Sequence, residues 1–213
     1  MRWSRRQPPA MITRLSVLLC CGLLAASAWS RPLPAVKDGD VIFQTSKSSQ
    51  SVAIQRATHS RYSHMGIIFL REGRPYVLEA SATVRYTPLG VWIARGQDGA
   101  AIVKRLRKDL SPSQVERLRA AARPFVGRPY DLVFEWSDSK IYCSELVWKI
   151  YDRAVGVHLG ELQRLRGFDL SDPLVRAKMK ERYGDAVPQD EKVISPGAMF
   201  DSPLLAVVVD GDT

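Results

Sequence analysis

The sequence predicts an α+β fold in which helices pack on an antiparallel sheet. Segments rich in β-branched and aromatic residues concentrate in residues 40–106, whereas amphipathic helical patterns concentrate in 111–183. Strands and helices that occupy separate parts of a chain are typical of this fold class. The length of 213 residues suits one domain. A hydrophobic fraction of 46% with 25% charged residues excludes a disordered chain.

The beginning of the chain has the pattern of a secretory signal peptide. Residues 1–14 carry four arginines and no acid, an apolar run follows over 15–26, and small residues at 26–28 form an A-x-A cleavage pattern. The apolar run of about a dozen residues is shorter than the roughly 20 that a membrane-spanning helix needs. We therefore expect a signal peptide over 1–28, a single domain over 29–213, and no stable membrane span after cleavage.

Removal of the signal peptide changes the charge and the cysteine content. It removes four of the 31 basic residues and none of the 22 acidic ones, so the net charge falls from +9 to +5. This modest positive charge suits an anionic surface, but no nucleic-acid-binding motif accompanies it, so we expect no nucleic-acid partner. Cys20 and Cys21 leave with the signal peptide. Cys143 then remains alone and cannot form an internal disulfide.

The first half of the mature chain predicts strands joined by turns. Asp38-Gly39-Asp40 is a turn signal, and the apolar residues 41–43 after it form a short strand. The polar stretch 45–60 is consistent with one helix. Two apolar runs on either side of turn residues 71–74 predict a hairpin over 64–80. Further elements are expected at 83–88 (strand), 90–96 (short helix or loop) and 101–106 (strand).

The second half predicts helices. Ser111 and Gln114 form a capping box around Pro112, and apolar residues at helical spacing continue this helix toward Gly127. A loop follows over 128–141. The remaining expected elements are a second amphipathic helix over 142–154, short helices and loops over 156–190 with one starting at Asp172-Pro173, and a last strand over 204–209.

Cys143 is the first candidate for chemistry. It lies in the first turn of the second amphipathic helix, where the positive end of the helix dipole and the unpaired backbone N–H groups favour a thiolate. The same N–H groups can stabilise a developing oxyanion. The alternative is a buried thiol that acts as a small hydrophobic residue.

His64 and Glu79 are the next candidates. His64 begins a predicted strand, and a neutral imidazole is the usual base for a thiol nucleophile. Glu79 interrupts an apolar run on the neighbouring strand of the hairpin, where its carboxylate can orient the imidazole. The alternatives are a structural histidine at a strand edge and an outward-facing glutamate. His59 and His158 are expected to be a solvated residue and a loop residue.

Other kinds of site are poorly supported. One cysteine and three dispersed histidines give no zinc-ligand spacing, and the chain has no glycine-rich phosphate loop and no G-x-S-x-G motif. We therefore expect neither a metal nor a cofactor.

Several motifs together resemble the YiiX/YaeF-like branch of circularly permuted, NlpC-type papain-like cysteine hydrolases. The resemblance covers roughly residues 38–209 and implies a permuted papain-like fold. It implies that Cys143 is the nucleophile, His64 the base and Glu79 the orienting acid. It also implies a tyrosine near the oxyanion, which Tyr130 supplies here, with Tyr142 as the rival. The motifs are Gly39-Asp-Val-Ile-Phe, Tyr62-Ser-His-Met-Gly-Ile, Val77-Leu-Glu-Ala, Tyr142-Cys-Ser-Glu-Leu-Val, Ile194-Ser-Pro and Phe200-Asp-Ser-Pro-Leu-Leu.

The resemblance implies an exported hydrolase of the bacterial periplasm or cell envelope. It would cleave an amide or ester bond through an acyl-thioester, with cell-wall (peptidoglycan) peptides as the expected substrate. A lipid-directed thiol hydrolase or acyltransferase acting on acylated molecules is the second hypothesis. Trp92, Ile93, Phe134 and Trp136 are candidates for an acyl-chain groove in that case, or ordinary core residues. A non-catalytic envelope-binding module is the third hypothesis.

Overall fold

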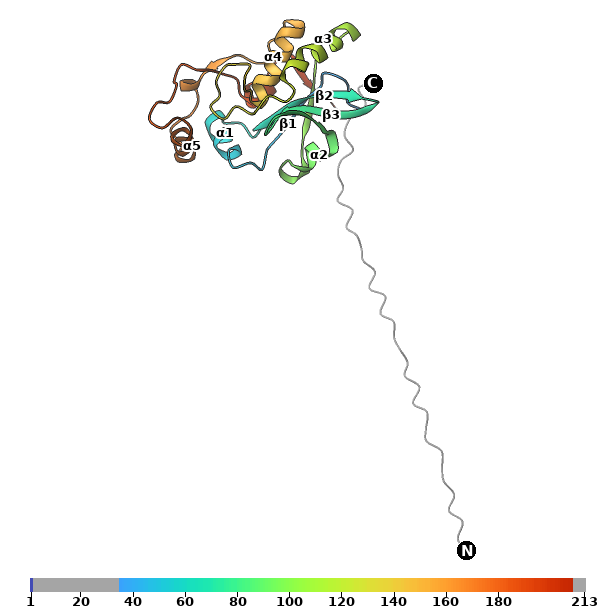
Figure 1. The fold of residues 1–213 in the computed structure, drawn as a ribbon, viewed down its shortest axis with the longest axis horizontal. Coiled ribbons are helices and arrows are strands. Elements are labelled where there is room, and N and C mark those ends of the chain that lie inside the picture. Colours follow the sequence, from blue (N-terminus) through green and yellow to red (C-terminus); the bar gives the residue numbers. More distant parts are fainter. Residues whose placement is uncertain (2–34, 209–213) are drawn as a thin grey trace. The chain divides into compact units, whose positions relative to one another are not determined.

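Within the residues that the computed structural model describes, Met1 and 35–208, a six-stranded antiparallel sheet forms the centre of the fold (Figure 1). The signal peptide expected over 1–28 lies outside these residues. The strand order is β4-β3-β2-β1-β5-β8. The strands are β1 (Val41–Gln44), β2 (His64–Arg71), β3 (Arg74–Ala80), β4 (Val84–Pro88), β5 (Ile102–Leu106) and β8 (Leu205–Val207).

The helices expected from the sequence occur along the chain in the predicted order. Figure 1 shows α3 and α4 on one side of the sheet and α2 on the other. The helices are α1 (Ser51–Thr58), α2 (Leu89–Ala94), α3 (Pro112–Ala122), α4 (Cys143–Val155), α5 (Pro173–Tyr183) and α6 (Pro196–Phe200). A small second sheet pairs β6 (Gln163–Arg164) with β7 (Lys192–Val193).

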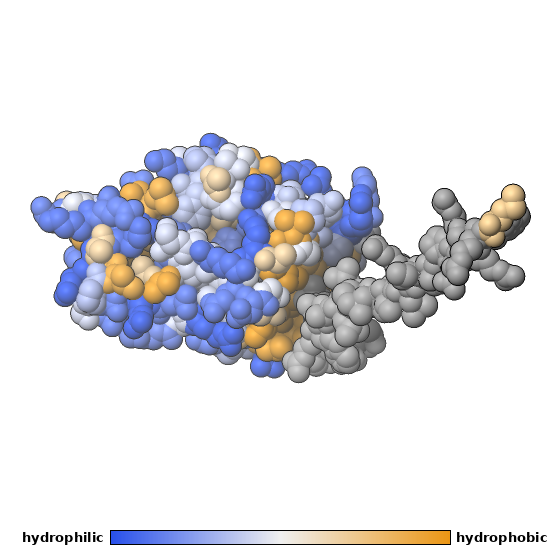
Figure 2. Space-filling view, turned by 90° about the horizontal axis from the view of Figure 1, so that it is seen from below, coloured by the Kyte–Doolittle hydropathy of each residue, from blue (hydrophilic) through white to orange (hydrophobic). Residues whose placement is uncertain are grey.

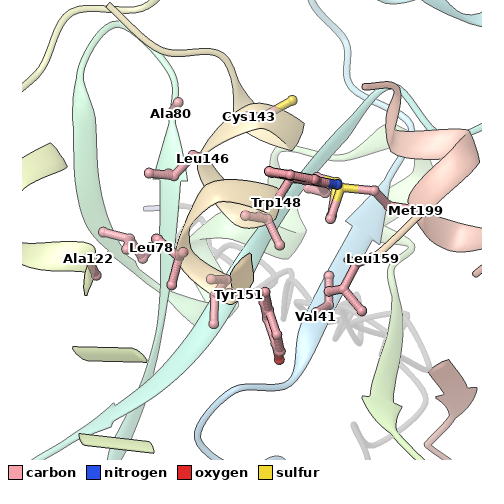
Figure 3. Packing of buried hydrophobic residues seen from close by; sticks show 14 of the residues in the cluster. Val41, Leu78, Ala80, Ala122, Cys143, Leu146, Trp148, Tyr151, Leu159 and Met199 are labelled. Carbon is pink, nitrogen blue, oxygen red and sulfur yellow. The ribbon is translucent and has the colours of Figure 1, made fainter. Parts of the chain in front are cut away.

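The sheet is buried on both faces. In β2, Met65, Ile67 and Phe69 belong to the main core with α3 and α4, whereas Ile68 packs in a smaller cluster with Trp92 of α2. Because successive residues of a strand point to opposite faces, burial of both faces requires an unbroken apolar run. Figure 3 shows α4 lying over the sheet, with Leu146 and Tyr151 in the main core and Cys143 at its beginning.

The fold confirms the predicted class, an α+β domain with an antiparallel sheet packed against helices. The hairpin turn lies at Glu72 and Gly73, which both have positive φ, as a two-residue hairpin turn requires. Ser111 caps α3 through a capping box with Gln114, and Asp172 caps α5.

Some expected boundaries were wrong. The helix expected over 45–60 is shorter, because residues 45–50 form a loop whose backbone bonds to the segment before β2: the N–H of Ser46 donates to Oγ of Ser63 at 2.9 Å. The helix that begins at Pro112 ends at Ala122 rather than near Gly127, and one 3-10 turn continues it. The short elements β6, β7 and α6 were not expected, because two to five residues show no periodicity.

Apolar residues on the face shown in Figure 2 form small groups among hydrophilic ones. Among the residues that the structure describes, no helix is long and apolar enough to cross a membrane.

Candidate active site

Cys143 is the first residue of α4 and is 3% exposed. Tyr142 before it has extended backbone angles, and its carbonyl accepts the first helical hydrogen bond, from the N–H of Leu146 at 3.0 Å. The N–H groups of Cys143, Ser144 and Glu145 precede this bond and have no partner within the helix, because a helix leaves its first donors unpaired. The thiol of Cys143 is therefore close to free backbone donors and to the positive end of the helix dipole.

Tyr142 and Ser144, the sequence neighbours of Cys143, both form hydrogen bonds with the backbone of Ile194. The hydroxyl of Tyr142 accepts a hydrogen bond from the N–H of Ile194 at 3.1 Å, and Oγ of Ser144 donates to the carbonyl of Ile194 at 2.8 Å. These two contacts fix the beginning of α4 against the segment that leads into α6.

A buried ion pair anchors α4 to the loop over 128–141. Nζ of Lys149 lies 2.7 Å from Oε1 of Glu145. It also donates to the carbonyl of Ser137 at 2.6 Å and to Oδ1 of Asp138 at 3.0 Å. Burial raises the pKa of Glu145 to about 7, although Lys149 acts in the opposite direction.

His64 is the first residue of β2, and the surrounding sequence fixes its place. Oγ of the buried Ser63 lies 2.6 Å from Oγ of Ser51 at the start of α1. A Cβ at Gly66 would lie 2.4 Å from Cγ1 of Val77 and 2.6 Å from the carbonyl oxygen of Leu78. Only glycine therefore allows β3 to come this close to the strand that carries His64.

Glu79 lies on β3 and is fully buried. Its Oε2 accepts hydrogen bonds from Nε2 of His64 at 2.7 Å and from the indole N–H of Trp92 at 3.0 Å. Its Oε1 accepts from the hydroxyl of Thr87 at 2.6 Å and from the guanidinium of Arg95. The outward-facing alternative is therefore wrong, and the carboxylate is held on both oxygens.

His64 hydrogen-bonds to Glu79, and the thiol of Cys143 interacts with the imidazole of His64. Because Nε2 of His64 contacts Glu79, the other ring nitrogen, Nδ1, remains for Cys143. Burial lowers the pKa of His64, but the hydrogen bonds to Cys143 and Glu79 outweigh it and raise the pKa to about 9. Burial raises the pKa of Glu79, but the hydrogen bonds from His64, Thr87 and Arg95 outweigh it and lower the pKa to about 2. At neutral pH an imidazolium therefore lies between the carboxylate and the thiol.

Tyr130 lies at the edge of the same site. Its hydroxyl accepts a hydrogen bond from Nε2 of Gln50 at 2.9 Å, and Oε1 of Gln50 accepts one from Arg182 at 2.6 Å. Burial raises the pKa of Tyr130, so its hydroxyl keeps its proton and can donate it. The rival, Tyr142, is 2% exposed and its hydroxyl is occupied by the N–H of Ile194.

Two hollows meet at this site. A pocket beside Cys143, with an empty volume of about 690 Å³ that includes space open to solvent, is lined by residues of α1 and α5. A second groove is lined by His64 and by the serine-rich stretch 46–49, together with apolar residues such as Ala80 and Leu132. Gln50 and Tyr130 line both hollows.

The other histidines lie elsewhere. His59 is exposed and its Nε2 is 3.5 Å from Asp169, whereas His158 stacks on Trp148 and contacts Asp152 at 2.8 Å. Neither lines the pocket beside Cys143.

Among the aromatic and apolar candidates for an acyl groove, only Phe134 lines this pocket. Trp92 is buried and bonds to Glu79, Ile93 packs with the second cluster, and Trp136 packs on Trp148.

Comparison with known proteins decides the family. Residues 35–209 match the model of a family described as "Permuted papain-like amidase enzyme, YaeF/YiiX, C92 family". The chain belongs to this family. It is 48% identical over 198 residues to the uncharacterized protein YiiX of Escherichia coli (strain K12). The matched region covers 93% of this chain and 96% of that protein. The resemblance and the fold inferred from the sequence are thereby confirmed.

A solved structure of a family member has the same fold. The crystal structure of yiiX from Escherichia coli O157:H7 (DUF1105) matches with a TM-score of 0.80 and 52% identity, over 82% of this chain and 97% of that one. That protein is described as a metalloprotein. In the part of this chain that the structure describes, no three His, Cys, Asp or Glu side chains come together to hold a metal ion. The His, Cys, Asp and Glu side chains of the described residues are therefore too dispersed to fit a metal ion.

The sequence interpretation missed the residues that support the triad candidates. Thr87, Trp92 and Arg95 bind Glu79, and Gln50 with Arg182 binds Tyr130. These contacts join distant segments, so no local pattern reveals them. Trp92 gave one local signal of these partners, because a buried indole near the predicted strands needs an acceptor for its N–H.

Proposed function

We propose that this chain is an exported cysteine amidase that forms an acyl-thioester on Cys143. His64 serves as base and acid, and Glu79 orients His64. The proposal is supported by the hydrogen bond of His64 to the buried Glu79 and by the interaction of His64 with Cys143 at the beginning of α4. The family, described as amidases, supports the class of reaction.

The proposed reaction has two steps. An imidazolium beside Cys143 favours the thiolate, and the sulfur attacks the carbonyl carbon of an amide. The C–N bond breaks and His64 gives its proton to the leaving amine. A water molecule then attacks the thioester, His64 takes a proton from that water, and the acid leaves as the C–S bond breaks. The sum is hydrolysis of the amide to an acid and an amine.

The oxyanion of each tetrahedral intermediate is proposed to lie at the beginning of α4. Backbone N–H groups there are aligned before the reaction, and Tyr130 adds a hydroxyl donor because Gln50 occupies its acceptor side. The removal of one such donor typically costs about 10²–10³-fold in kcat.

The location and the substrate are proposals as well. The signal peptide pattern over 1–28 supports export to the bacterial periplasm or cell envelope. Peptidoglycan peptides are one substrate class there. Acylated small molecules or lipids are the other, and the apolar pocket beside Cys143 favours them.

The first test is alkylation of Cys143 by iodoacetamide as a function of pH, in the mature protein and in His64→Ala. We expect the wild-type rate to stay high well below pH 8.5, the reference for a free thiol, and His64→Ala to lose this. His158→Ala is the matched control, because His158 is exposed and contacts Asp152 instead, and it should behave as the wild type. If Cys143 is unreactive, or if the wild type and His64→Ala are alkylated at equal rates, the catalytic proposal is refuted. An envelope-binding module then remains.

The second test separates the substrate classes. Purified peptidoglycan and acylated lipids would each be incubated with the mature protein and with Cys143→Ala. Products released from one material by the wild type and not by Cys143→Ala identify the class.

A further inference from the structure

We infer that the side-chain amide of Gln44 binds the water molecule that attacks the thioester beside His64. Gln44 is then a catalytic residue of the second step, because it touches a reacting molecule. This inference rests on the proposed function and adds to it the residue that directs the acyl group to water. It comes from the position of a buried amide whose oxygen has no partner among the described residues.

Gln44 is the last residue of β1 and lies directly opposite His64 of β2. Side chains of opposite residues in an antiparallel pair share one face of the sheet, with Cβ atoms about 4.5–5.5 Å apart. This face is the one that α2 covers, because Ile42 of β1 packs in one cluster with Trp92, and the ring of His64 stacks on Trp92 at 5.6 Å. The side chain of Gln44 therefore lies beside the imidazole.

The amide of Gln44 is buried with its acceptor unused. The residue is 3% exposed, and its Oε1 has no hydrogen-bond partner within the described part of the chain. A Cβ at Gly96 would lie 2.4 Å from this oxygen, so the glycine makes room for the amide. A buried polar group without a partner costs free energy, and native proteins keep few of them. A polar molecule that takes part in the reaction can supply this partner.

Gln44 also lines the groove that His64 lines. Two other polar side chains of this groove already have partners in the protein. Oγ of Ser63 bonds both to the loop before α1 and to α1 itself, and the guanidinium of Arg95 binds Glu79. The amide oxygen of Gln44 therefore remains as an acceptor next to the proposed base.

The second step needs a water molecule in this place. After the first step His64 has given a proton to the leaving amine, so its Nδ1 can accept one. The water oxygen attacks the thioester carbon as Nδ1 takes one proton of the water, and the C–S bond then breaks with its electron pair on the sulfur. The other water proton is donated to Oε1 of Gln44, whose amide can turn toward the groove because the last torsion of glutamine is broad. Two acceptors thus point a lone pair of the water at the thioester.

The experiment measures the two steps separately with p-nitrophenyl acetate. Release of nitrophenolate reports acylation of Cys143, and mass spectrometry of the isolated acetyl-protein reports loss of the acetyl group. Gln44→Met has a similar volume and removes both polar atoms. Its acylation should keep the wild-type rate, whereas loss of the acetyl group should be slower by about 10- to 100-fold, since misplacement of a reactant costs up to about this much.

A structural role of Gln44 would not change which acceptor takes the acyl group. Hydroxylamine attacks a thioester as a neutral amine, without first losing a proton, so it does not need the water site. At a fixed concentration of hydroxylamine, the ratio of acetohydroxamate to acetate should rise about 10-fold or more in Gln44→Met. Iodoacetamide should alkylate Cys143 of this variant at the wild-type rate, because His64 keeps its contacts with Cys143 and Glu79.

Two further variants make the test specific. Gln97 is exposed and shares another hollow with Gln44 but does not line the groove, so Gln97→Met should equal the wild type in both steps. Gly96→Ala keeps the amide and displaces it, because the added Cβ meets Oε1 while the backbone φ of −69° accepts alanine. It should slow the loss of the acetyl group in the wild type but not in Gln44→Met. Circular dichroism and thermal unfolding establish that the variants fold.

The outcomes separate the inference from the proposed function. Equal slowing of both steps in Gln44→Met, or an unchanged ratio of acetohydroxamate to acetate, overturns the inference and leaves the proposed function intact. Slower acylation with unchanged loss of the acetyl group also overturns it, because Gln44 then binds the leaving part of the substrate. If the wild type forms no acetyl-thioester on Cys143, the proposed function falls and the inference falls with it.

Discussion

The carboxylate of Glu79 accepts a 2.7 Å hydrogen bond from Nε2 of His64. This contact leaves the other ring nitrogen of His64 free for Cys143. Since Glu79 is fully buried and held by Thr87, Trp92 and Arg95 as well, the imidazole has one orientation. The imidazole that we propose as the base is therefore oriented before any substrate binds.

The charge of His64 can be measured directly. Its pKa of about 9 should appear as one histidine ring signal that titrates near pH 9 in the NMR spectrum of the mature protein, and His64→Gln should remove that signal. In Cys143→Ala the midpoint should fall, because one of the two hydrogen bonds that raise the pKa is lost. An unchanged midpoint in Cys143→Ala would show that the thiol does not contact His64.

The same shift predicts how stability depends on pH. A group whose pKa is raised in the folded protein binds more protons when folded. The stabilisation from His64 is therefore complete below pH 6.5 and lost as the pH rises through about 9. Urea unfolding of the wild type from pH 6 to 9.5 should show a decline that is smaller in His64→Gln. Parallel curves for the two proteins would contradict this expectation.

Glu79 should affect the stability of the protein at acidic pH. Its pKa is lowered from 4.5 to about 2, so its stabilisation is present above pH 4.5 and lost as the pH falls toward 2. On acidification, the free energy of unfolding of Glu79→Gln should fall by about 1–3 kcal/mol less than that of the wild type. It should also lower kcat about 10²-fold or more, because the imidazole loses its charged partner. Glu116→Gln is a control, since the side chain of Glu116 is largely exposed and its nearest charged partner, Arg119, lies 3.7 Å away.

Gln50 should act through Tyr130. Tyr130→Phe should lower kcat about 10²–10³-fold with little change in KM. Gln50→Ala should do the same in smaller measure, and Arg182→Met less again, because each removes one support of the hydroxyl. The double variant Gln50→Ala/Tyr130→Phe should equal Tyr130→Phe alone. Additive losses in this cycle would mean that Gln50 acts independently of Tyr130.

Lys149 should be a structural residue. Lys149→Met leaves the buried Glu145 without its cation and should destabilise the protein by about 3–5 kcal/mol at pH 8. Since the pKa of Glu145 is about 7 even beside Lys149, Glu145 can take up a proton as the pH falls. The destabilisation should therefore shrink at pH 5.5, and Lys149→Met/Glu145→Gln should be milder than Lys149→Met at pH 8. A loss of equal size at both pH values would contradict the role of the pair.

Local patterns were enough to predict most of the fold. The apolar runs of β2 and β3, the turn at Glu72 and the cap at Ser111 each depend on neighbours within a few residues. The loop over 45–50 was mistaken for helix, because its hydrogen bond to Ser63 joins segments 17 residues apart.

The candidate site residues could be predicted from the sequence, but their hydrogen-bond partners and the pocket beside them could not. Residue type and position singled out Cys143, His64 and Glu79, and the structure brings these three side chains together. The contact of Gln50 with Tyr130 spans 80 residues. The apolar pocket likewise needs α1 and α5 side by side. Such arrangements depend on tertiary packing, which the spacing of residues along one chain does not encode.

The separation of the pocket walls from the reactive side chains has a consequence for evolution and for engineering. The side chains proposed to react come from β2, β3 and α4, whereas the apolar walls come from α1, α5 and the segments around 165–170 and 193–196. Exchanges on α1 and α5 can therefore reshape this pocket without touching the side chains proposed to react. A directed library confined to Ala53, Ala57, Val175 and Met179 should change which compounds the pocket accepts while Cys143 keeps its reactivity toward iodoacetamide.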